Sequence, residues 1–367
     1  MTITAQDSTS WLAERSSGAM SPGSVLVHAP SHAFQSPGGG ENQLVQTSRH
    51  LEDLGVTIRP FSPWADRIED ARLLHLYGMS REGLELAKVA RSRGVPVVVS
   101  PICWFEPRAL AALAGSRPRA AMDLITWSAR RILPRLPDWR RRQLDLADAI
   151  LPNSHAEARQ LESLFGADLR KVFVVPNGVD PRFAESDPEL FRSRYGDEEF
   201  VLYVGRIEPR KNVLNLIRGV TRIRRPLVVI GEAVPGHERY FEDCRREGEA
   251  NVRFLRRVDH ADPLLASAMA AARVLALPSW FETPGLAALE AALAGCAIVI
   301  TPYGCTREYF GDEVEYARPG DVSAIASAIA SAWERGASAK LANHVADRYP
   351  WSAVARATKE AYDRIDG

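Results

Sequence analysis

The chain of 367 residues has few cysteines, no excess of charge of either sign and no long apolar run. Its four cysteines are too sparse for a disulfide framework, and no two of them form a CxxC metal or redox pair. We therefore expect reduced thiols at Cys103, Cys244, Cys296 and Cys305. Lysine and arginine number 46, as do aspartate and glutamate, so no global field draws the molecule to nucleic acid or anionic lipid.

Because the chain lacks long apolar runs, the sequence predicts no membrane-spanning helix. The most apolar stretches, such as Met269–Leu277, contain charge or end at proline well short of the roughly 20 residues that a bilayer requires. Residues 1–23 lack a basic region followed by an apolar core, so we expect a disordered leader and a cytoplasmic protein. With 46% apolar and 25% charged residues, the rest of the chain has the composition of a folded globular protein.

Short β-type runs alternate with amphipathic helical stretches, which is typical of parallel sheets covered by helices on both faces. The pattern occurs twice, so we predict an α/β fold with two Rossmann-like domains. The predicted strands are Val25–His28, Val56–Phe61, Leu73–Tyr77, Val95–Val99, Ala149–Leu151 and Val172–Val175, then Phe200–Val204, Leu227–Ile230, Val252–Leu255, Val274–Leu277 and Ala297–Ile300. The predicted helices are Glu41–Leu54, Arg81–Arg93, one that begins at Ser154, Asn212–Arg222, Glu238–Glu247, Pro263–Ala272, Leu286–Ala294, Val322–Arg335 and Trp351–Ile365.

The sequence Pro176-Asn177-Gly178 predicts the boundary between the two domains, because Asn-Gly beside proline favours a turn. We predict an N-terminal domain over residues 24–178, a C-terminal domain over residues 179–348 and a final helix within residues 349–367. Two such domains facing each other form a cleft, and open α/β sheets bind ligands at the carboxyl ends of their strands.

Two cations follow the first predicted strand of the C-terminal domain. Arg206 and Lys211 lie five residues apart in a loop that begins directly after a buried-strand pattern. Arginine can bind two phosphate oxygens at once and lysine acts as a point charge, so together they could neutralise a leaving diphosphate without a metal ion. A solvated basic loop explains the same residues equally well, since Arg210 adds a third cation.

A helix rich in small residues follows the strand Val274–Leu277 and has two glutamates near it. The amides of its first turn, from Gly285 to Ala287, lack helical acceptors and attract anions. Glu282 lies at the helix entrance, whereas Glu290 lies inside the helix in an apolar run, where a buried carboxylate requires a partner. Ribose hydroxyls would satisfy Glu290. A structural salt bridge is the alternative.

A glycine-rich turn, Gly38-Gly39-Gly40, separates the first predicted strand from the first predicted helix. Gln43 stands where the third glycine of the GxGxxG fingerprint would fall, which disfavours a nicotinamide dehydrogenase. The turn still allows the backbone to approach a ligand at a helix N-terminus.

Taken together, these motifs resemble glycosyltransferase family 4. The resemblance covers residues 24–365 and rests on GGGE after the first strand, PNGVD at 176–180, GRIEPRKN at 205–212, the E-x7-E pair in ETPGLAALEAALAG, and the helix that begins at Pro350-Trp351. It implies a GT-B fold, in which two Rossmann-like domains face each other across a donor cleft and the last helix crosses back to the first domain. It also implies retaining transfer of a sugar from a nucleoside-diphosphate sugar, with no metal or other cofactor.

The resemblance further implies roles for individual residues. Arg206 and Lys211 match the family's diphosphate-binding pair, and Glu282 matches the glutamate that contacts the donor sugar, so these three are the predicted catalytic residues. Glu290 matches the ribose ligand. The remaining predicted donor-binding residues are Gly39 and Gly40 near the reaction centre, Val258 in the loop that contacts the nucleobase, Thr283, and the backbone of Pro284, Gly285, Leu286 and Ala287 at the distal phosphate.

One departure from the family pattern follows the strand Val95–Val99. Many members have a histidine there, near the reacting sugar, whereas this chain has Ser100-Pro101-Ile102-Cys103-Trp104. Its loss need not abolish turnover, since front-face retaining transfer relies chiefly on stabilising the leaving group and on the departing phosphate accepting the acceptor's proton. Glu106 is a candidate substitute contact, and His28 and His32 are as readily structural as functional.

A basic segment runs from Arg117 to Arg142. Its eight arginines are Arg117, Arg119, Arg130, Arg131, Arg135, Arg140, Arg141 and Arg142, against Asp123 and Asp138, with Trp127, Ile132, Leu133, Leu136 and Trp139 interleaved. This composition suits an anionic membrane surface or a lipid-diphosphate acceptor. A solvated helical pair with inward-facing tryptophans explains it equally well. Nucleic acid is disfavoured, because no recognition motif accompanies the arginines.

The leading hypothesis is a retaining glycosyltransferase that uses a glycan or lipid-linked acceptor, in the synthesis of cell-surface polysaccharide, lipopolysaccharide or glycolipid. It would act in the cytoplasm or at the inner face of the membrane. The alternative is a catalytically idle GT-B module that binds a nucleotide sugar or scaffolds polysaccharide assembly. The resemblance implies that the base is contacted through backbone atoms, so the sequence does not identify the base. The acceptor domain has few family-wide residues, so the sugar, acceptor and linkage stay open, as does the oligomeric state.

Overall fold

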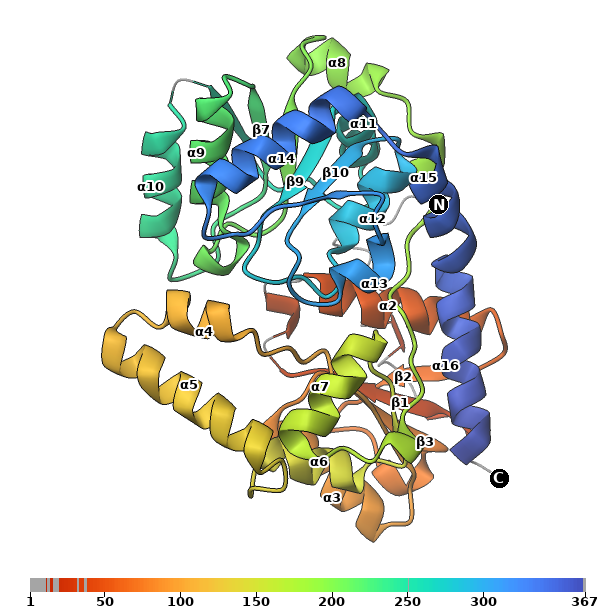
Figure 1. The fold of residues 1–367 in the computed structure, drawn as a ribbon. Coiled ribbons are helices and arrows are strands. Elements are labelled where there is room, and N and C mark those ends of the chain that lie inside the picture. The colour runs from red at the N-terminus through yellow and green to blue at the C-terminus, as the bar shows by residue number, and fades with distance from the viewer. Residues whose placement is uncertain are drawn as a thin grey trace. The chain divides into compact units, whose positions relative to one another are not determined.

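The computed structural model describes residues 11, 14–15, 20–31, 33–35, 38–249 and 251–365, and the chain divides into two compact units (Figure 1). The N-terminal unit contains the described residues up to Pro107, Ser116–Gly178 and the helix from Trp351 onward. The C-terminal unit contains Arg108–Gly115 and Val179–Pro350. Most of the predicted leader and His32 lie outside the described residues. None of the helices in the described part of the chain is long and apolar enough to cross a membrane.

The N-terminal unit is built on a parallel sheet of five strands in the order β2-β1-β3-β4-β5. The strands are β1 (Val25–His28), β2 (Ile58–Pro60), β3 (Leu73–Tyr77), β4 (Val97–Ser100) and β5 (Ala149–Ile150). Nearly all of their residues are buried, which explains why these strands read as continuous apolar runs in the sequence.

The helices of this unit are α2 (Gly39–Glu52), α3 (Arg81–Ser92), α5 (Arg117–Ile132), α6 (Trp139–Leu146), α7 (His155–Phe165) and α16 (Trp351–Ile365). Hydroxyl caps start several of them: the Ser80 Oγ atom accepts a hydrogen bond from the Gly83 amide at 2.8 Å, and the Ser154 Oγ atom accepts one from the Glu157 amide at 3.0 Å. The predicted helix start at Ser154 is therefore confirmed.

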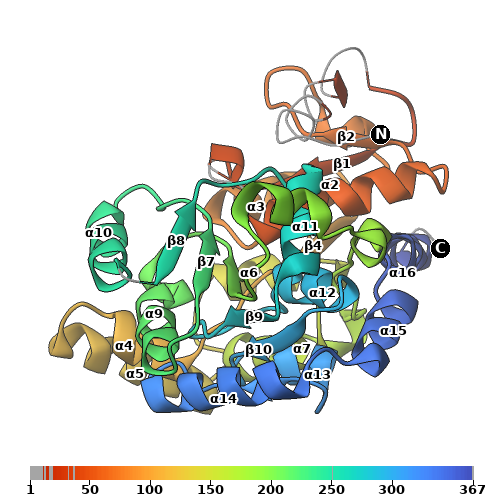
Figure 2. The ribbon, with the colours of Figure 1, turned by 90° about the horizontal axis from the view of Figure 1, so that it is seen from above.

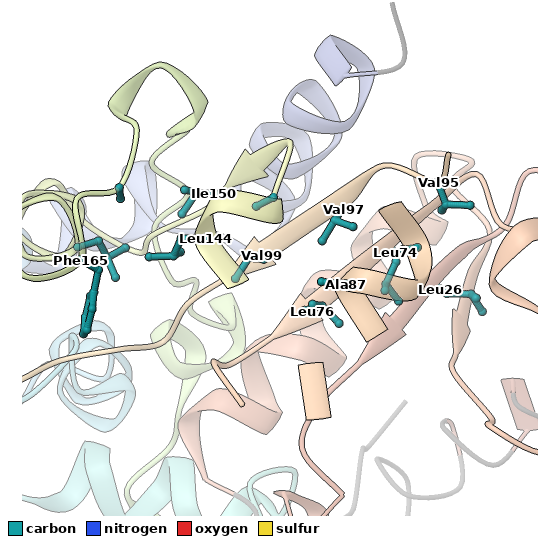
Figure 3. Packing of buried hydrophobic residues seen from close by; sticks show 14 of the residues in the cluster. Leu26, Leu74, Leu76, Ala87, Val95, Val97, Val99, Leu144, Ile150 and Phe165 are labelled. Atoms are coloured by element: carbon teal, nitrogen blue, oxygen red, sulfur yellow. The ribbon is translucent and has the colours of Figure 1, made fainter. Parts of the chain in front are cut away.

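The core of the N-terminal unit lies between its sheet and the helices that cover it (Figure 3). Four strand side chains point toward the helices α3 and α6: Leu74, Leu76, Val97 and Val99. Ala87 of α3 is fully buried among them. Burial of such side chains is the main favourable term in folding, at about 25 cal/mol per Å² of apolar surface.

The last helix, α16, belongs to the N-terminal unit although it follows the whole of the C-terminal unit in sequence. It packs against α2, and its Tyr362 hydroxyl is hydrogen-bonded to the Nδ1 atom of His75 on β3 at 2.6 Å. The Nε2 atom of His75 is 2.9 Å from the Ser100 hydroxyl, so both ring nitrogens have partners. Burial lowers the pKa of His75 to about 3.

The C-terminal unit has a parallel sheet of six strands in the order β11-β10-β9-β6-β7-β8. They are β6 (Val201–Val204), β7 (Leu227–Ile230), β8 (Val252–Leu255), β9 (Val274–Leu277), β10 (Ala297–Ile300) and β11 (Glu315–Tyr316). Its helices are α4 (Pro107–Leu113, of which Pro107 falls in the N-terminal unit), α8 (Glu189–Tyr195), α9 (Val213–Arg222), α10 (Glu238–Glu247), α11 (Pro263–Ala271), α12 (Leu286–Leu293), α13 (Thr306–Phe310), α14 (Val322–Arg335) and α15 (Ala339–Arg348). Figure 2 shows α14 on one side of β9 and β10, with α11 and α12 on the other.

One predicted strand is wrong. Val172–Val175 forms no strand; Val172 makes a single isolated bridge with Ile150, and the Val175 amide donates to the Pro152 carbonyl at 2.9 Å. The neighbouring strand β5 is only two residues long and is followed by Pro152, whose nitrogen has no hydrogen to donate, so a regular ladder does not continue. The four cysteines form no disulfide, as expected.

Candidate functional site

Two loops of the C-terminal unit are joined directly after the strands β6 and β9. The Trp280 amide donates to the Arg210 carbonyl at 2.9 Å. Asn212, which adopts a left-handed backbone conformation at φ 60°, donates from its side chain to the Pro278 and Pro319 carbonyls, both at 2.8 Å. These bonds fix the 3-10 helix η5 (Pro209–Lys211) against the segment that follows β9.

The backbone of Glu282 is held by a close approach to Gly304. The two residues form a parallel bridge, and a Cβ atom at position 304 would lie 1.9 Å from the Glu282 carbonyl oxygen. Gly304 also has a φ of 100°, so only glycine fits there without strain. The Glu282 amide donates to the Tyr303 carbonyl at 3.1 Å, which completes the clamp.

The clamp brings Glu282 to Lys211, which lies 71 residues away in sequence. The Lys211 Nζ atom is 2.7 Å from Glu282 Oε1, and the Ser279 hydroxyl donates to the same oxygen at 2.6 Å. The Glu282 side chain is 5% exposed and that of Lys211 is 17% exposed. Burial alone would raise the pKa of Glu282, but the charges of Lys211 and Arg210 hold it below its usual value. Glu282 is therefore an acceptor-only carboxylate. Both of these bonds are to Oε1, and no hydrogen bond from a described residue to Oε2 is found, so Oε2 could accept from a hydroxyl group.

The other two cations of this loop have different environments. Arg206 is 40% exposed, with its Nη2 atom 3.5 Å from Glu208 Oε1, so it is available to an anion. Arg210 instead lies 3.0 Å from Glu208, donates to the Phe281 carbonyl at 3.4 Å and covers the Phe281 ring. Arg210 thus holds the loop in place. From the sequence it was interpreted only as a third cation of a basic loop, and this structural role was not predicted.

The helix α12 begins beside this carboxylate. Gly285 is its N-cap residue, at a φ of 96°, and Thr283, Pro284, Leu286 and Ala287 flank it in the chain. A Cβ atom at Gly285 would lie 3.5 Å from the Glu282 side chain, so the first turn of the helix starts at the Lys211–Glu282 pair. The assignment of this backbone to a distal phosphate stays a prediction.

Glu290 is buried and has a half-buried partner that was not predicted from the sequence. Its Oε1 atom is 2.7 Å from the Nε2 atom of His260, and the two side chains are 7% and 31% exposed. His260 lies two residues after Val258, in the loop between β8 and α11. The sequence position of His260, next to the predicted base-contacting loop, could have identified it as a candidate site residue. A polar ring at that place can contact either the ligand or the carboxylate of Glu290.

The N-terminal unit contains Gly39 and Gly40, in the first turn of α2. Glu41 accepts from the Gly38 amide at 2.7 Å. The Ile102 side chain lies 3.5 Å from the position of a Cβ atom on Gly40, and Ile102 itself has a φ of 47°, a strained conformation for a β-branched residue. This is the segment in which the resemblance led us to expect a histidine.

The strained segment is held by Glu157 of α7. Its carboxylate accepts from the Cys103 amide at 2.7 Å and from the Asn153 amide at 2.8 Å. Glu157 is completely buried, and burial raises its pKa to about 7 even though the two amides oppose the shift. Ser154 and Glu157 stand three residues apart, as in a capping box. The Ser154 hydroxyl caps the helix, whereas the Glu157 carboxylate holds the loop at Cys103.

Glu106 and His28 are the other two polar candidates from the sequence, and the structure favours a structural role only for His28. Glu106 is 7% exposed. His28 packs edge-on against Phe61 at 6.2 Å between ring centroids, and lies 3.8 Å from Glu82. Burial lowers the pKa of His28, which favours its structural interpretation.

Family models match both halves of the chain. Residues 37–183 match the model described as Glycosyltransferase Family 4, and residues 198–335 match the model described as Glycosyl transferases group 1. The two matches together account for most of the chain. They include every predicted site residue from Gly39 to Glu290.

Curated and structural relatives agree with these matches. The chain is 33% identical over 247 residues to D-inositol 3-phosphate glycosyltransferase 2 of Catenulispora acidiphila, a match that covers 60% of this chain but only 57% of that protein. The fold of the chain is similar to that of sucrose-phosphate synthase of Thermosynechococcus elongatus, with a TM-score of 0.74, 17% identity and coverage of 93% and 99% of the two chains. Anabaena HepE in complex with UDP-glucose matches with a TM-score of 0.67, 18% identity and coverage of 93% and 99%. The predicted fold class, two Rossmann-like domains of the GT-B type, is confirmed.

Proposed function

Because this chain belongs to glycosyltransferase family 4, we propose that it transfers a sugar from a nucleoside-diphosphate sugar to a glycan or lipid-linked acceptor, with retention of configuration. The observation that carries the proposal is the buried Lys211–Glu282 pair, with Ser279 on the same oxygen, at the start of α12. A buried ion pair rarely adds net stability over an apolar pair, so its presence beside a helix N-terminus favours a role in binding.

Lys211 and Glu282 suit the two groups that the reaction would separate, with Lys211 at the phosphate and Glu282 at the sugar. In the proposed reaction the bond between the sugar C1 and the diphosphate oxygen breaks, the acceptor oxygen bonds to C1, and the acceptor's proton passes to the departing phosphate. Lys211, with Arg206 and the first amides of α12, would neutralise the developing phosphate charge, in place of a metal ion. The Glu282 carboxylate would accept from a sugar hydroxyl and hold the ring in position.

A nucleotide panel tests this proposal. We expect one of UDP, GDP, ADP or TDP to raise the melting temperature of the purified protein, because a ligand at 100 times its dissociation constant adds about 2.7 kcal/mol of stability. The matching sugar nucleotides should then be hydrolysed slowly or transferred to an acceptor. Saturable binding without turnover on any acceptor would favour the idle binding module. No shift with any of the four nucleotides would contradict the site assignment.

On the acceptor side, we propose that the segment from Arg117 to Arg142 binds the surface of an anionic membrane. The helix α5, at the left of Figure 1, has no buried residue, and Met122, Ile125 and Ile132 are 61%, 63% and 77% exposed along one face of it. Eight arginines against two aspartates give the segment a net charge of +6 within a chain whose net charge is zero. The inward-facing tryptophan of the alternative is also present, since Trp127 packs against the core. The opposite face of the helix, with Met122, Ile125 and Ile132, is exposed to solvent. A solvated helix does not explain an exposed apolar face, whereas a membrane-binding helix does. A location at the inner face of the membrane stays a prediction.

Vesicle sedimentation checks the membrane proposal. The protein should sediment with vesicles that contain phosphatidylglycerol and stay in solution with pure phosphatidylcholine, because each basic residue near an anionic surface contributes about 1 kcal/mol. The double variant Met122→Ser/Ile132→Ser should reduce binding about tenfold or more. Leu169→Ser, at an exposed leucine outside the segment, is the matched control. Equal binding to both lipids, or no loss in the double variant, would contradict a membrane-binding face on α5.

A further inference from the structure

A chain of four polar side chains ends at Glu290. It begins at Asp180, the last residue of the PNGVD motif, whose Oδ2 atom lies 3.3 Å from the Nε atom of Arg182 in the 3-10 helix η4 (Pro181–Glu185). Arg182 reaches the loop before α11, where its Nη1 atom donates to the Ala261 carbonyl at 3.1 Å and its Nη2 atom donates to the His260 carbonyl. His260 then contacts Glu290. All four residues belong to the C-terminal unit.

The arginine determines how the histidine ring is used. The Nη2 atom of Arg182 lies 3.4 Å from His260 Nδ1, and a guanidinium group has hydrogens to donate but no lone pair to accept with. Nδ1 must therefore be the accepting nitrogen, and Nε2 carries the hydrogen that is donated to Glu290 at 2.7 Å. The Phe183 ring, 5.7 Å from the imidazole between centroids, packs beside it and limits its rotation.

This contact leaves Glu290 half satisfied. Oε1 is committed to His260, whereas no donor among the described residues is hydrogen-bonded to Oε2. Glu290 lies in the apolar helix Leu286–Leu293, where a carboxylate kept for structure alone would be expected to have both oxygens paired. The partial exposure of His260, at 31%, shows that the pair is reachable from solvent.

We propose that His260, held by Arg182 and Asp180, is a positioning residue that orients Glu290 so that Oε2 accepts a hydrogen bond from a ribose hydroxyl of the donor nucleotide. The assignment rests on the proposed function, because it requires a nucleotide in the site. It combines the two sequence interpretations of Glu290: one oxygen makes the structural contact, and the other recognises ribose. It also gives the PNGVD motif a part in the donor site, through Asp180.

The experiment compares ribonucleotides with their deoxy counterparts. Affinities of wild type, His260→Ala and His260→Gln are measured for UDP, GDP and ADP and for the 2′-deoxy and 3′-deoxy forms of each. We expect wild type to prefer the ribose form of its nucleotide over at least one deoxy form by about tenfold or more, as for a hydrogen bond to a charged group. His260→Ala should lose about tenfold in affinity for the ribose form while its affinity for that deoxy form stays unchanged. His260→Gln, whose amide can donate from a similar position, should recover most of the difference.

Controls separate this proposal from loss of fold and from failure of the proposed function. Melting temperatures without ligand show whether each variant folds, and His237→Ala, at a histidine whose side chain does not cap α10, should behave as wild type. Equal losses for ribose and deoxy forms in His260→Ala would overturn the proposal, as would unchanged affinities for both. If wild type binds none of the three ribonucleotides and does not bind TDP either, the proposed function fails first and this assignment falls with it.

Discussion

Lys211→Met should reduce sugar transfer by about a hundred- to a thousandfold, as removal of a charge-stabilising donor does in other enzymes. It should also destabilise the C-terminal unit by about 3 kcal/mol, because it leaves the Glu282 carboxylate buried without its cation. The double variant Lys211→Met/Glu282→Gln should recover most of that stability, since the introduced amide is neutral and its oxygen can still accept from Ser279. Its turnover should stay as low as that of the single variant. Urea unfolding and steady-state transfer with the donor identified by the nucleotide panel measure the two effects.

The contrast between stability and turnover distinguishes a binding pair from a purely structural one. Lys340 is the matched control, because its Nζ atom lies 2.7 Å from Glu313 in an ion pair that is 81% exposed on the lysine side. Lys340→Met should leave stability and turnover unchanged within error. Recovery of turnover in the double variant together with stability would show that Lys211 acts only by neutralising Glu282, and would contradict its assignment to the diphosphate.

The second large effect is on the pH dependence of stability in the N-terminal unit. Burial lowers the pKa of His75 to about 3, so the unfolded chain binds the extra proton between pH 3 and 6.5 and stability falls as the pH decreases through that range. Burial raises the pKa of Glu157 to about 7, so the folded chain binds the extra proton between pH 4.5 and 7 and stability falls as the pH increases. Between pH 4.5 and 6.5 the two slopes, each up to about 1.4 kcal/mol per pH unit, oppose each other.

Single variants should separate the contributions of His75 and Glu157 to the pH dependence of the unfolding free energy. Relative to wild type, Glu157→Gln should lose about 3 kcal/mol more stability on going from pH 6.5 to 4.5, because only the His75 contribution is left. His75→Gln should show the opposite trend over the same range. Urea unfolding of wild type and both variants at pH 4.5, 5.5 and 6.5 measures the differences, in which the contributions of the exposed carboxylates cancel. Parallel stability curves for wild type and Glu157→Gln would show that this carboxyl is not protonated in the folded state.

Much of the architecture could be predicted from local sequence patterns. The strand Val274–Leu277 and the helices Val322–Arg335 and Trp351–Ile365 are found with the predicted bounds. A run of buried residues, or a repeat that places apolar side chains on one face of a helix, depends only on residues close in sequence. The error at Val172–Val175 has the opposite cause, since a strand there required a neighbour long enough to pair with.

The candidate site was predicted in its parts but not in its connections. Glu282 and Lys211 were identified separately through the family resemblance, and so was Glu290. No sequence pattern predicted that Lys211 contacts Glu282, whose backbone is held at Gly304. None predicted that Glu290 contacts His260, or that Arg182 contacts the same histidine. The use of the Glu157 carboxylate to hold the strained Ile102 segment was likewise unpredictable, because the capping motif explained that residue locally.

By itself, the sequence determined the succession of strands and helices, the family, and the residue types available for binding a diphosphate and two sugars. Only the tertiary structure decided which of these residues share an oxygen atom, which cation is exposed, and which carboxylate is left with an unused acceptor. The physical reason is the range of the interactions: helix and strand preferences act over a few residues, whereas a buried charge is satisfied by whichever partner the packing of distant loops brings within hydrogen-bond distance.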